Sequence, residues 1–261
     1  MIVERVWVGN ALRNYNYLVA CGQTGEALLI DPLDHRACLR LARERGYEVT
    51  QVLNTHEHRD HVGGNDRVVA ATGAAVVAHH RAQIAGVDRR VGAGDVVRVG
   101  ATVALECMDT PGHTMSHVCL LARGPEAALF SGDTLFNAGA GNCHNGGHPE
   151  VLYETFSRQL ARLDDDVRLY PGHDYLVGNL RFTLDREPDN AAAAAQLTAV
   201  AGRDGDAAPV LTIGQERAVN TFFRLDSPGV RAGLRRAFDG LSAALDEREV
   251  FLLLRELRNR W

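Results

Sequence analysis

Short apolar runs rich in β-branched residues recur from the amino terminus to about Pro171, and Gly, Pro, Asp or His separates them. Runs of this length between turn residues are typical of β-strands. The predicted strands are VERVWV, NYNYLVA, EALLIDP, VTQVLNTH, AAVVAHH, DVVRVG, ATVALECMDTPGH, AALFSGD and DVRLYPGH. Helical periodicity between them predicts helices over 35–46, 65–73 and 149–163. We therefore expect residues 1–173 to form one sheet-rich domain with interspersed helices.

The pattern changes after His173, where apolar positions follow a helical period and Ala, Leu, Arg and Glu dominate. Four segments predict helices, at 174–188, 189–202, 227–247 and 248–261. Ser227 before Pro228 has the form of an N-cap followed by proline at the first helical position. Residues 202–209, GRDGDAAP, are the most linker-like stretch. We expect residues 174–261 to form a second, helical domain.

Composition indicates an ordinary globular protein, because 46% of the 261 residues are hydrophobic and the formal net charge is −5. Since basic charge is not in excess, we expect no nucleic acid and no anionic membrane as a partner. No apolar stretch is long enough to span a bilayer. The amino terminus alternates like a strand and carries charges, unlike a signal peptide.

Cysteine and lysine usage narrows the chemistry further. The five cysteines are widely spaced and form no C-x-x-C pair, which argues against a disulfide framework and makes the cytoplasm the expected location. All 28 basic residues are arginines. The absence of lysine excludes a Schiff-base lysine and a lysine general base.

One motif concentrates metal-binding residue types. THEHRDHVGG follows the predicted strand VTQVLN and contains His56, His58, Asp60 and His61 within six positions. Imidazoles and carboxylates without cysteine suit zinc, iron or manganese. In extended backbone, side chains project to alternate sides, so His56 and His58 can face one metal while Asp60 and His61 face another. The alternative, a solvated polar turn, explains this combination of residues less well.

Three further candidates stand at the ends of predicted strands: His113 in DTPGHT, Asp133 in SGDTLF and His173 in YPGHDY. Ligands from several strand ends can converge on one rim of a sheet. Asp133 is the natural bridge, because one carboxylate can bind two cations. A single loop histidine is more often a surface or packing residue, but the first motif favours the ligand interpretation for these.

Other histidines lack this framing, and we expect His35, His79, His80 and His117 to be surface or packing residues. The tract GNCHNGGHPE, with Cys143, His144 and His148, is either an accessory metal-binding segment or a loop beside the site. Its Gly and Asn content favours the loop.

In their order and spacing, THEHRDHVGG, DTPGHT, SGDTLF and YPGHDY resemble the metallo-β-lactamase superfamily, and specifically the glyoxalase II (hydroxyacylglutathione hydrolase) family. NLRFTLDREPDN and ERAVNTFFRLDSP resemble that family's carboxy-terminal helical domain, which most other branches lack. The resemblance implies an α/β (α+β) fold, an αββα sandwich of two mixed sheets over residues 1–173. The helices of 174–261 would then form the substrate-binding domain.

The resemblance also implies two divalent metal ions, zinc in the first place and iron or manganese as alternatives. One ion would be held by His56, His58 and His113, and the other by Asp60, His61 and His173. Asp133 and a water or hydroxide would bridge them, which makes Asp60, His61 and Asp133 the implied catalytic residues. The implied reaction is hydrolysis of a small-molecule thioester, S-2-hydroxyacylglutathione, by the bridging hydroxide, in a monomer or homodimer.

The chain departs from the family in residues that hold glutathione. Glyoxalase II usually has G-C-G followed by Lys or Arg, whereas this chain reads GAGN over 139–142, so the cation is missing. Its place is taken by Asn142, and His144 stands where the family has a tyrosine. Tyr175 matches a family aromatic, and Arg258 an arginine that binds a glutathione carboxylate. The candidate substrate-binding residues are Asn142, His144, Tyr175 and Arg258, and Arg224 and Arg255 are further candidates.

Two other reactions stay open on the same motifs. An iron-dependent persulfide dioxygenase resembles glyoxalase II in these residues but uses a single iron, and a lactonase or phosphodiesterase would use the same metal pair. The long carboxy-terminal helical segment favours the hydrolase over the dioxygenase. A non-catalytic binding protein is disfavoured, because all seven candidate ligands are present.

Overall fold

The computed structural model describes residues 1–242 and 244–261 and contains two large mixed sheets. The first sheet runs β1-β2-β3-β4-β5-β6; its first three strands are antiparallel neighbours and its later ones are parallel. Parallel pairing requires crossover connections, which helices supply between β3 and β4 and between β4 and β5, whereas residues 80–88 connect β5 to β6 without a helix. The strands are β1 (Ile2–Trp7), β2 (Tyr15–Ala20), β3 (Glu26–Ile30), β4 (Glu48–Asn54), β5 (Ala75–His79) and β6 (Arg89–Val91).

The second sheet has the order β13-β10-β9-β8-β7, in which only β13 and β10 are parallel. A separate two-stranded ribbon, β11 with β12, follows β10. The strands are β7 (Val96–Val99), β8 (Val103–Asp109), β9 (Val118–Ala122), β10 (Ala128–Gly132), β11 (Leu135–Phe136), β12 (Gly139–Ala140) and β13 (Arg168–Pro171).

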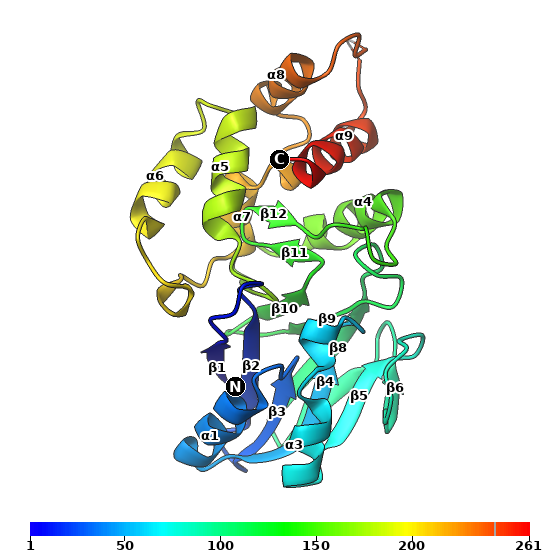
Figure 1. The fold of residues 1–261 in the computed structure, drawn as a ribbon, viewed down its shortest axis with the longest axis vertical. Helices are drawn as coiled ribbons and strands as arrows, with labels where there is room; N and C mark the ends of the chain where they lie inside the picture. Colours follow the sequence, from blue (N-terminus) through cyan, green and yellow to red (C-terminus); the bar gives the residue numbers. More distant parts are fainter. Residues whose placement is uncertain (243) are drawn as a thin grey trace.

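Side chains from both sheets share one buried core. Leu28 and Ile30 of β3 belong to the same cluster as Leu105, Leu120 and Phe130 of the second sheet. Alternate residues of a strand face opposite sides, so each sheet has a second apolar face that must be covered. Helices α1 (His35–Arg45) and α3 (Asn65–Thr72) cover that face of the first sheet, and α4 (Pro149–Arg158) covers it on the second (Figure 1). The predicted αββα sandwich is confirmed.

The remaining helices pack together at one end of the sandwich, beside α4 and the β11–β12 ribbon (Figure 1). Buried residues of these helices, such as Phe182 and Phe251, share a cluster with Phe222 of the 3₁₀ turn Thr221–Phe223, Leu129 of β10 and Leu152 of α4. The carboxy-terminal helices therefore extend the core of the second sheet rather than standing apart. They are α5 (Leu176–Arg186), α6 (Ala191–Val200), α7 (Ile213–Val219), α8 (Pro228–Ala237) and α9 (Glu247–Asn259).

Backbone hydrogen bonds join the helical part to the sheet edge. The Leu169 N–H donates to the Leu211 carbonyl at 2.7 Å, and the Ile213 N–H donates to the Val167 carbonyl at 2.9 Å. These bonds cover the outer edge of β13, whose polar groups would otherwise lack partners. The linker-like stretch 202–209 is also held, because Tyr15 donates to the Gly205 carbonyl and Arg5 to the Ala208 carbonyl. The stretch lies between α6 and α7, within the helical part.

Several predicted elements need correction. Strand β9 was missed, although VCLLA is a buried apolar run between Ser116 and a Gly-Pro turn. Helix α7 was missed as well, although Thr212 and Gln215 form a capping box at its start. The helix expected over 149–163 ends at Arg158 and is followed by a 3₁₀ turn. The helix expected over 227–247 ends at Ala237; within that range Ala243 lies outside the described residues.

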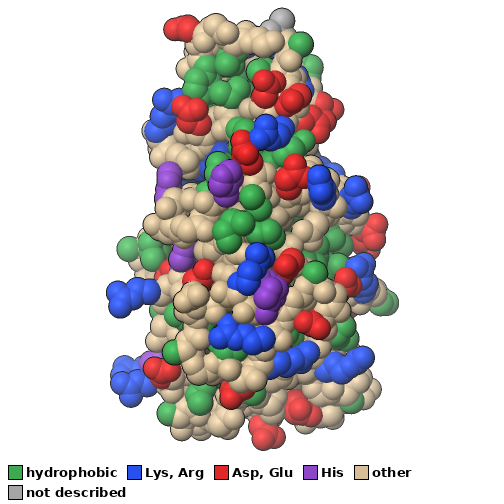
Figure 2. All heavy atoms as spheres, turned by 90° about the vertical axis from the view of Figure 1, so that its right-hand side faces the viewer, with side chains coloured by type: hydrophobic (Ala, Val, Ile, Leu, Met, Phe, Trp, Pro, Cys, Tyr) green, Lys and Arg blue, Asp and Glu red, His purple; other side chains and the backbone are tan. Residues whose placement is uncertain are grey.

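The surface and the cysteines give two further observations. Among the described residues, no helix has the length and apolarity needed to cross a membrane. On the face shown in Figure 2, acidic and basic side chains are interspersed. All five cysteines are free thiols, and four of them are buried.

A buried ion pair stabilises the helical part from within. Glu187, at the end of α5, accepts hydrogen bonds from Arg224, Ser227 and Asn190. Burial alone would raise the pKa of Glu187, but the bonds from Arg224, Ser227 and Asn190 outweigh it and lower the pKa below 4.5. The candidate substrate-binding residue Arg224 is committed to this pair.

Replacing Glu187 by Gln should therefore cost about 1–3 kcal/mol of unfolding free energy at neutral pH. The contribution of a carboxylate with a lowered pKa is present above pH 4.5 and is lost as the pH falls through the folded-state value. The difference between wild type and Glu187→Gln should narrow accordingly in urea denaturation from about pH 7 to about pH 3. If the difference in unfolding free energy between the two proteins stayed constant over this pH range, Glu187 would not be ionised in the folded protein.

Candidate metal centre

The seven candidate ligands come from loops at one edge of the two sheets. His56 follows β4, Asp133 follows β10, and His173 follows β13. His113 lies in the loop after β8. Asp60 and His61 lie in a single helical turn, α2 (Arg59–Val62), so the extended backbone expected for this part of the motif is wrong. The turn nevertheless directs both side chains to the same centre as the strand ends.

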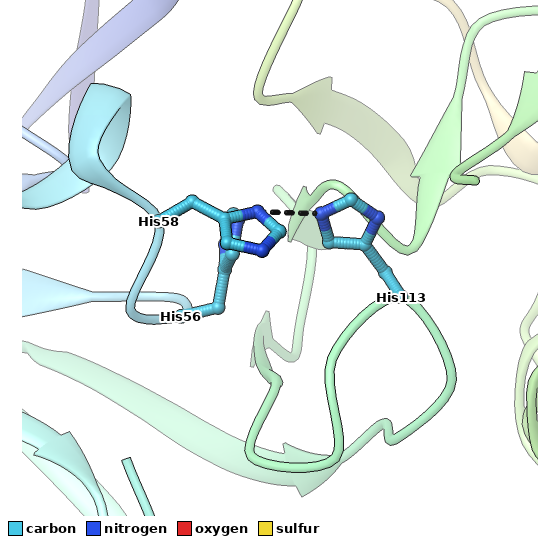
Figure 3. A group of neighbouring side chains, drawn as sticks. All are labelled: His56, His58 and His113. Carbon is cyan, nitrogen blue, oxygen red and sulfur yellow. Dashed lines mark hydrogen bonds between the residues drawn. The ribbon is translucent and has the colours of Figure 1, made fainter. Parts of the chain in front are cut away.

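Three histidines form the first ligand group, His56, His58 and His113 (Figure 3). His58 Nδ1 lies 3.0 Å from His56 Nε2 and 3.1 Å from His113 Nε2. The second group comprises Asp60, His61 and His173. In it, His61 Nε2 lies 3.3 Å from His173 Nε2, and both nitrogens lie 3.5 Å from Asp60 Oδ2.

Asp133 stands between the two groups. Its Oδ2 lies 3.5 Å from His113 Nε2 and 3.2 Å from His173 Nε2, and its Oδ1 lies 3.4 Å from His61 Nε2. Burial would raise the pKa of this carboxyl, but His173 and His61 outweigh burial and hold the pKa well below its usual range. One ionised carboxylate therefore faces members of both groups.

The outer nitrogens of the histidines are all engaged with oxygen atoms. His113 Nδ1 donates to the Asn142 carbonyl at 2.7 Å, His173 Nδ1 to the Leu12 carbonyl at 2.7 Å, and His58 Nε2 to the Asn145 carbonyl at 3.0 Å. His61 Nδ1 donates to Asp31 at 2.9 Å, and His56 Nδ1 lies 3.0 Å from the Thr55 hydroxyl. Because a neutral imidazole carries one proton, these partners leave a lone pair on each inner nitrogen.

This arrangement fits metal ions. Inner nitrogens with lone pairs lie 3.0–3.3 Å apart, where a cation between them removes the repulsion. Burial, together with the neighbouring His61, lowers the pKa of His56 well below its usual range, so protonation does not resolve its contact with His58. At His61 and His173, burial is outweighed by the Asp133 carboxylate, which raises the pKa. Asp133 Oδ1 is buried without a hydrogen-bond donor. The His and Asp clusters suit a binuclear site.

Two buried residues that the sequence did not single out orient the ligands. Asp31 accepts hydrogen bonds from His61 Nδ1 and from the Thr55 N–H and hydroxyl. Asn14 donates to Asp60 Oδ2 at 3.0 Å. Carboxylate and carbonyl partners of this kind fix the tautomer and direction of ligating histidines. The sequence does hold a signal for Asp31. It stands at the end of the apolar strand in IDP, and that strand pairs with the strand that leads into the THEHRDHVGG motif.

Close backbone approach requires glycine at two positions. A Cβ on Gly172 would lie 2.4 Å from Asp133 Oδ1, and one on Gly141 would lie 1.9 Å from the Asp133 carbonyl. A larger residue would displace the Asp133 carboxylate at position 172 and the Asp133 backbone carbonyl at position 141. These two glycines therefore clear the space that Asp133 occupies.

The histidines expected to be packing or surface residues lie outside the two ligand groups. His117 is buried beneath the site, where its Nε2 accepts from the Asp133 N–H and its ring stacks on His56. His79 is buried and bonded to Asp109, whereas His80 is exposed and His35 is half-buried. Among the described residues, no ligand group includes Cys143, His144 or His148. Their tract forms a loop beside the site, and its Asn145 carbonyl contacts His58.

The four candidate substrate-binding residues line one cavity of about 210 Å³. Tyr175 connects this cavity to the ligands, because its ring stacks on His173 at a centroid distance of 5.0 Å. Arg258 and the buried Arg255, both on α9, contribute positive charge to the wall. The structure thus brings Asn142, His144, Tyr175, Arg255 and Arg258 together, and leaves Arg224 apart.

Two family models together match nearly the whole chain. The metallo-beta-lactamase superfamily model matches residues 10–173, and the hydroxyacylglutathione hydrolase C-terminus model matches residues 174–261. A hydroxyacylglutathione hydrolase of Polaromonas sp. is 62% identical, and one of Nitrosococcus oceani is 56% identical, each over 100% of both chains. The chain belongs to the hydroxyacylglutathione hydrolase family. The predicted resemblance to glyoxalase II is confirmed.

Solved structures support the same superfamily for this hydroxyacylglutathione hydrolase family member. The crystal structure of ETHE1 from Myxococcus xanthus has a TM-score of 0.70 and 28% identity, covering 99% of this chain and 92% of that one. The crystal structure of TTHA1623 in a di-iron-bound form has a TM-score of 0.61 and 26% identity, covering 84% and 99%.

The role of Asp31 can be tested by replacement with Asn. Asn tolerates the left-handed backbone at this position, where φ is 50°, but it has one acceptor oxygen for donors from both His61 and Thr55. We expect Asp31→Asn to weaken metal affinity about 10–100-fold, as for other partners of ligating histidines. Metal content after equilibrium dialysis against buffered zinc measures this. Asp88→Asn, which alters a carboxylate that accepts from the Val76 N–H and belongs to no ligand group among the described residues, is the control. Unchanged zinc content in Asp31→Asn would contradict the role.

Proposed function

We propose that this chain hydrolyses S-2-hydroxyacylglutathione, such as S-lactoylglutathione, to a hydroxy acid and glutathione. The observation that carries this proposal is a pair of ligand groups sharing buried Asp133 beside a cavity lined by Tyr175 and two arginines. The names of the relatives that are 62% and 56% identical support the same substrate. Division of the chain into a catalytic domain, 1–173, and a substrate-binding domain, 174–261, follows from this assignment.

The residues that would hold two divalent cations are His56, His58 and His113 for one, and Asp60, His61 and His173 for the other, with Asp133 shared. We propose zinc, with iron or manganese as alternatives, since imidazole and carboxylate ligands accept all three. Such ions supply a water ionised near pH 7 and polarise a carbonyl oxygen.

The chain's own residues position the water and the thioester. Asp60 is the more accessible ligand carboxylate, with 24% of its side chain exposed against 9% for Asp133. Asn14 bonds to Asp60 Oδ2 and so fixes the carboxylate that faces incoming solvent. Asp133, ionised and buried, keeps the two halves of the site at a fixed separation. The leaving thiol has a pKa near about 8.5 in solution, so it can depart as thiolate without a protein acid.

The helical part would bind the glutathione portion. Burial lowers the pKa of Arg258, but an arginine remains protonated at neutral pH and can pair with a carboxylate. Arg255 donates to the Ala140 and Gly141 carbonyls and so lies directly under the position where the family carries its loop cation. Arginine in α9 thus compensates for the uncharged Asn142. The free cysteines are compatible with the cytoplasmic location that we propose.

Elemental analysis of the purified protein, paired with thiol release from S-lactoylglutathione, tests the reaction. We expect about two metal ions per chain, as in binuclear hydrolases, with rapid thiol release. One iron per chain and oxygen uptake with glutathione persulfide would instead indicate the dioxygenase. Two metal ions without thiol release would move the search to lactones and phosphodiesters.

Arg258 should affect binding more than chemistry. Replacing it with Gln removes a charge-assisted contact to the substrate, and we expect KM for S-lactoylglutathione to rise about tenfold with little change in kcat. Arg248→Gln, on the same helix but exposed and paired with Glu150, is the control and should leave KM unchanged. Equal effects of the two substitutions on KM would contradict a specific role for Arg258.

A further inference from the structure

Glu216 is a buried carboxylate in α7 whose partners lie mostly outside the helical part. Its side chain is completely buried. Oε1 accepts from Asn137 Nδ2 at 3.0 Å, and Oε2 accepts from the Ala138 N–H at 2.7 Å and from Asn220 Nδ2 at 3.1 Å. Two of these three donors belong to the turn between β11 and β12, so Glu216 fixes that turn from across the interface.

The segment that Glu216 fixes is the one that builds the metal centre. It begins directly after Asp133 and continues through β11 and β12 to Asn142 and Asn145. The Asn142 carbonyl accepts from His113 Nδ1, and the Asn145 carbonyl accepts from His58 Nε2. This segment, which directly follows the shared carboxylate, therefore orients two of the three ligands of the first group.

This segment depends on the helical part for its conformation. The β11–β12 ribbon pairs with neither large sheet, and Ala138 has a φ of 54°, a left-handed conformation that L-residues with a Cβ resist. Side chains of the helical part hold the ribbon through its carbonyls: Asn179 at Asn137, Asn220 at Gly139, and Arg255 at Ala140 and Gly141. Glu216 adds a contact of the other kind, because it accepts from the N–H of Ala138, the residue with the left-handed backbone.

Stability alone does not account for a carboxylate at this position. Burial raises the pKa of Glu216 to about 7, while its three N–H donors act in the opposite direction. A buried charge costs desolvation energy that an apolar residue of similar volume avoids. A carboxylate does present two acceptor oxygens to three converging donors. Its contribution here is therefore to fix the positions of the groups that carry these donors.

We propose that Glu216 is a positioning residue for the metal centre, acting through residues 137–145 to hold His113 and His58 in their ligating orientation. The inference rests on the proposed metal-dependent function. The helical part then contributes to metal affinity as well as to substrate binding.

The test compares two replacements of Glu216. Glu216→Leu keeps the volume but leaves the Ala138 N–H and Asn137 Nδ2 without acceptors. Glu216→Gln keeps an acceptor for Ala138, and Asn137 can turn its amide to match the new donor. With zinc as the probe and a chromophoric chelator as competitor, we expect Glu216→Leu to weaken the less tightly held zinc at least tenfold. The zinc affinity of Glu216→Gln should stay within about threefold of the wild-type affinity. Both expected values are set against the losses of metal affinity that are typical when a partner of a metal ligand is replaced.

Glu187→Leu is the matched control, because Glu187 is also a buried carboxylate of the helical part but contacts only residues of that part. It should lower the urea midpoint while leaving zinc affinity within about twofold of the wild type. Equal losses of zinc affinity in Glu187→Leu and Glu216→Leu, or none in a folded Glu216→Leu, would overturn the proposal.

A second variant covers the case in which Glu216→Leu does not fold. Asn137→Ala removes the donor to Glu216 Oε1, one of the three hydrogen bonds to this carboxylate, and should also weaken zinc binding. If this variant folds and its zinc affinity is unchanged, the inference is overturned. The zinc titration uses no thioester. A wild type that binds two zinc ions but releases no thiol would therefore count against the proposed reaction and not against the role of Glu216.

Discussion

The structure is organised around one ionised carboxylate buried among imidazoles. Asp133 lies within 3.2–3.5 Å of inner nitrogens of His61, His113 and His173, and one of its oxygens has no hydrogen-bond donor. A buried charge of this kind is costly unless cations or donors compensate it. The outer nitrogens of the histidines are already committed to oxygen atoms, so the inner side of the site offers lone pairs only. Metal ions satisfy both the carboxylate and the nitrogens.

That constraint sets demands on the surrounding backbone. Two sheets must end at the same edge, because β4 supplies His56 while β10 and β13 supply Asp133 and His173. The chain must also pass close to Asp133, which only glycine permits at 172, beside the carboxylate, and at 141, beside the backbone carbonyl. The ligands project from rigid strand ends and one helical turn, whereas the residues that orient them come from distant segments. This separation of tasks is typical of sites that must hold their geometry before substrate arrives.

The same separation explains what the sequence could and could not predict. His56, His58, Asp60 and His61 form a local pattern, and His113, Asp133 and His173 stand at predicted strand ends, so the sequence could predict that these seven residues lie close together. Their orienting partners are largely backbone carbonyls, of Leu12, Asn142 and Asn145, and a carbonyl has no residue type to recognise. Strand β9 was missed because a fully buried strand does not alternate. The helix expected to 247 stops at Ala237 because Asp239 and Gly240, with φ of 71°, end its period.

Position 142 shows how the metal centre and the substrate site impose different requirements on one loop. The Asn142 carbonyl accepts from His113, so the path of the backbone there is fixed by the metal centre. The Asn142 side chain makes a different contact, because its Oδ1 accepts from the His144 N–H. The uncharged side chain of Asn142 is therefore compatible with the ligand geometry, and it adds no charge to the cavity. Arg255 of α9 donates to the Ala140 and Gly141 carbonyls, so the helical part holds the same stretch of the loop from the side opposite to His113.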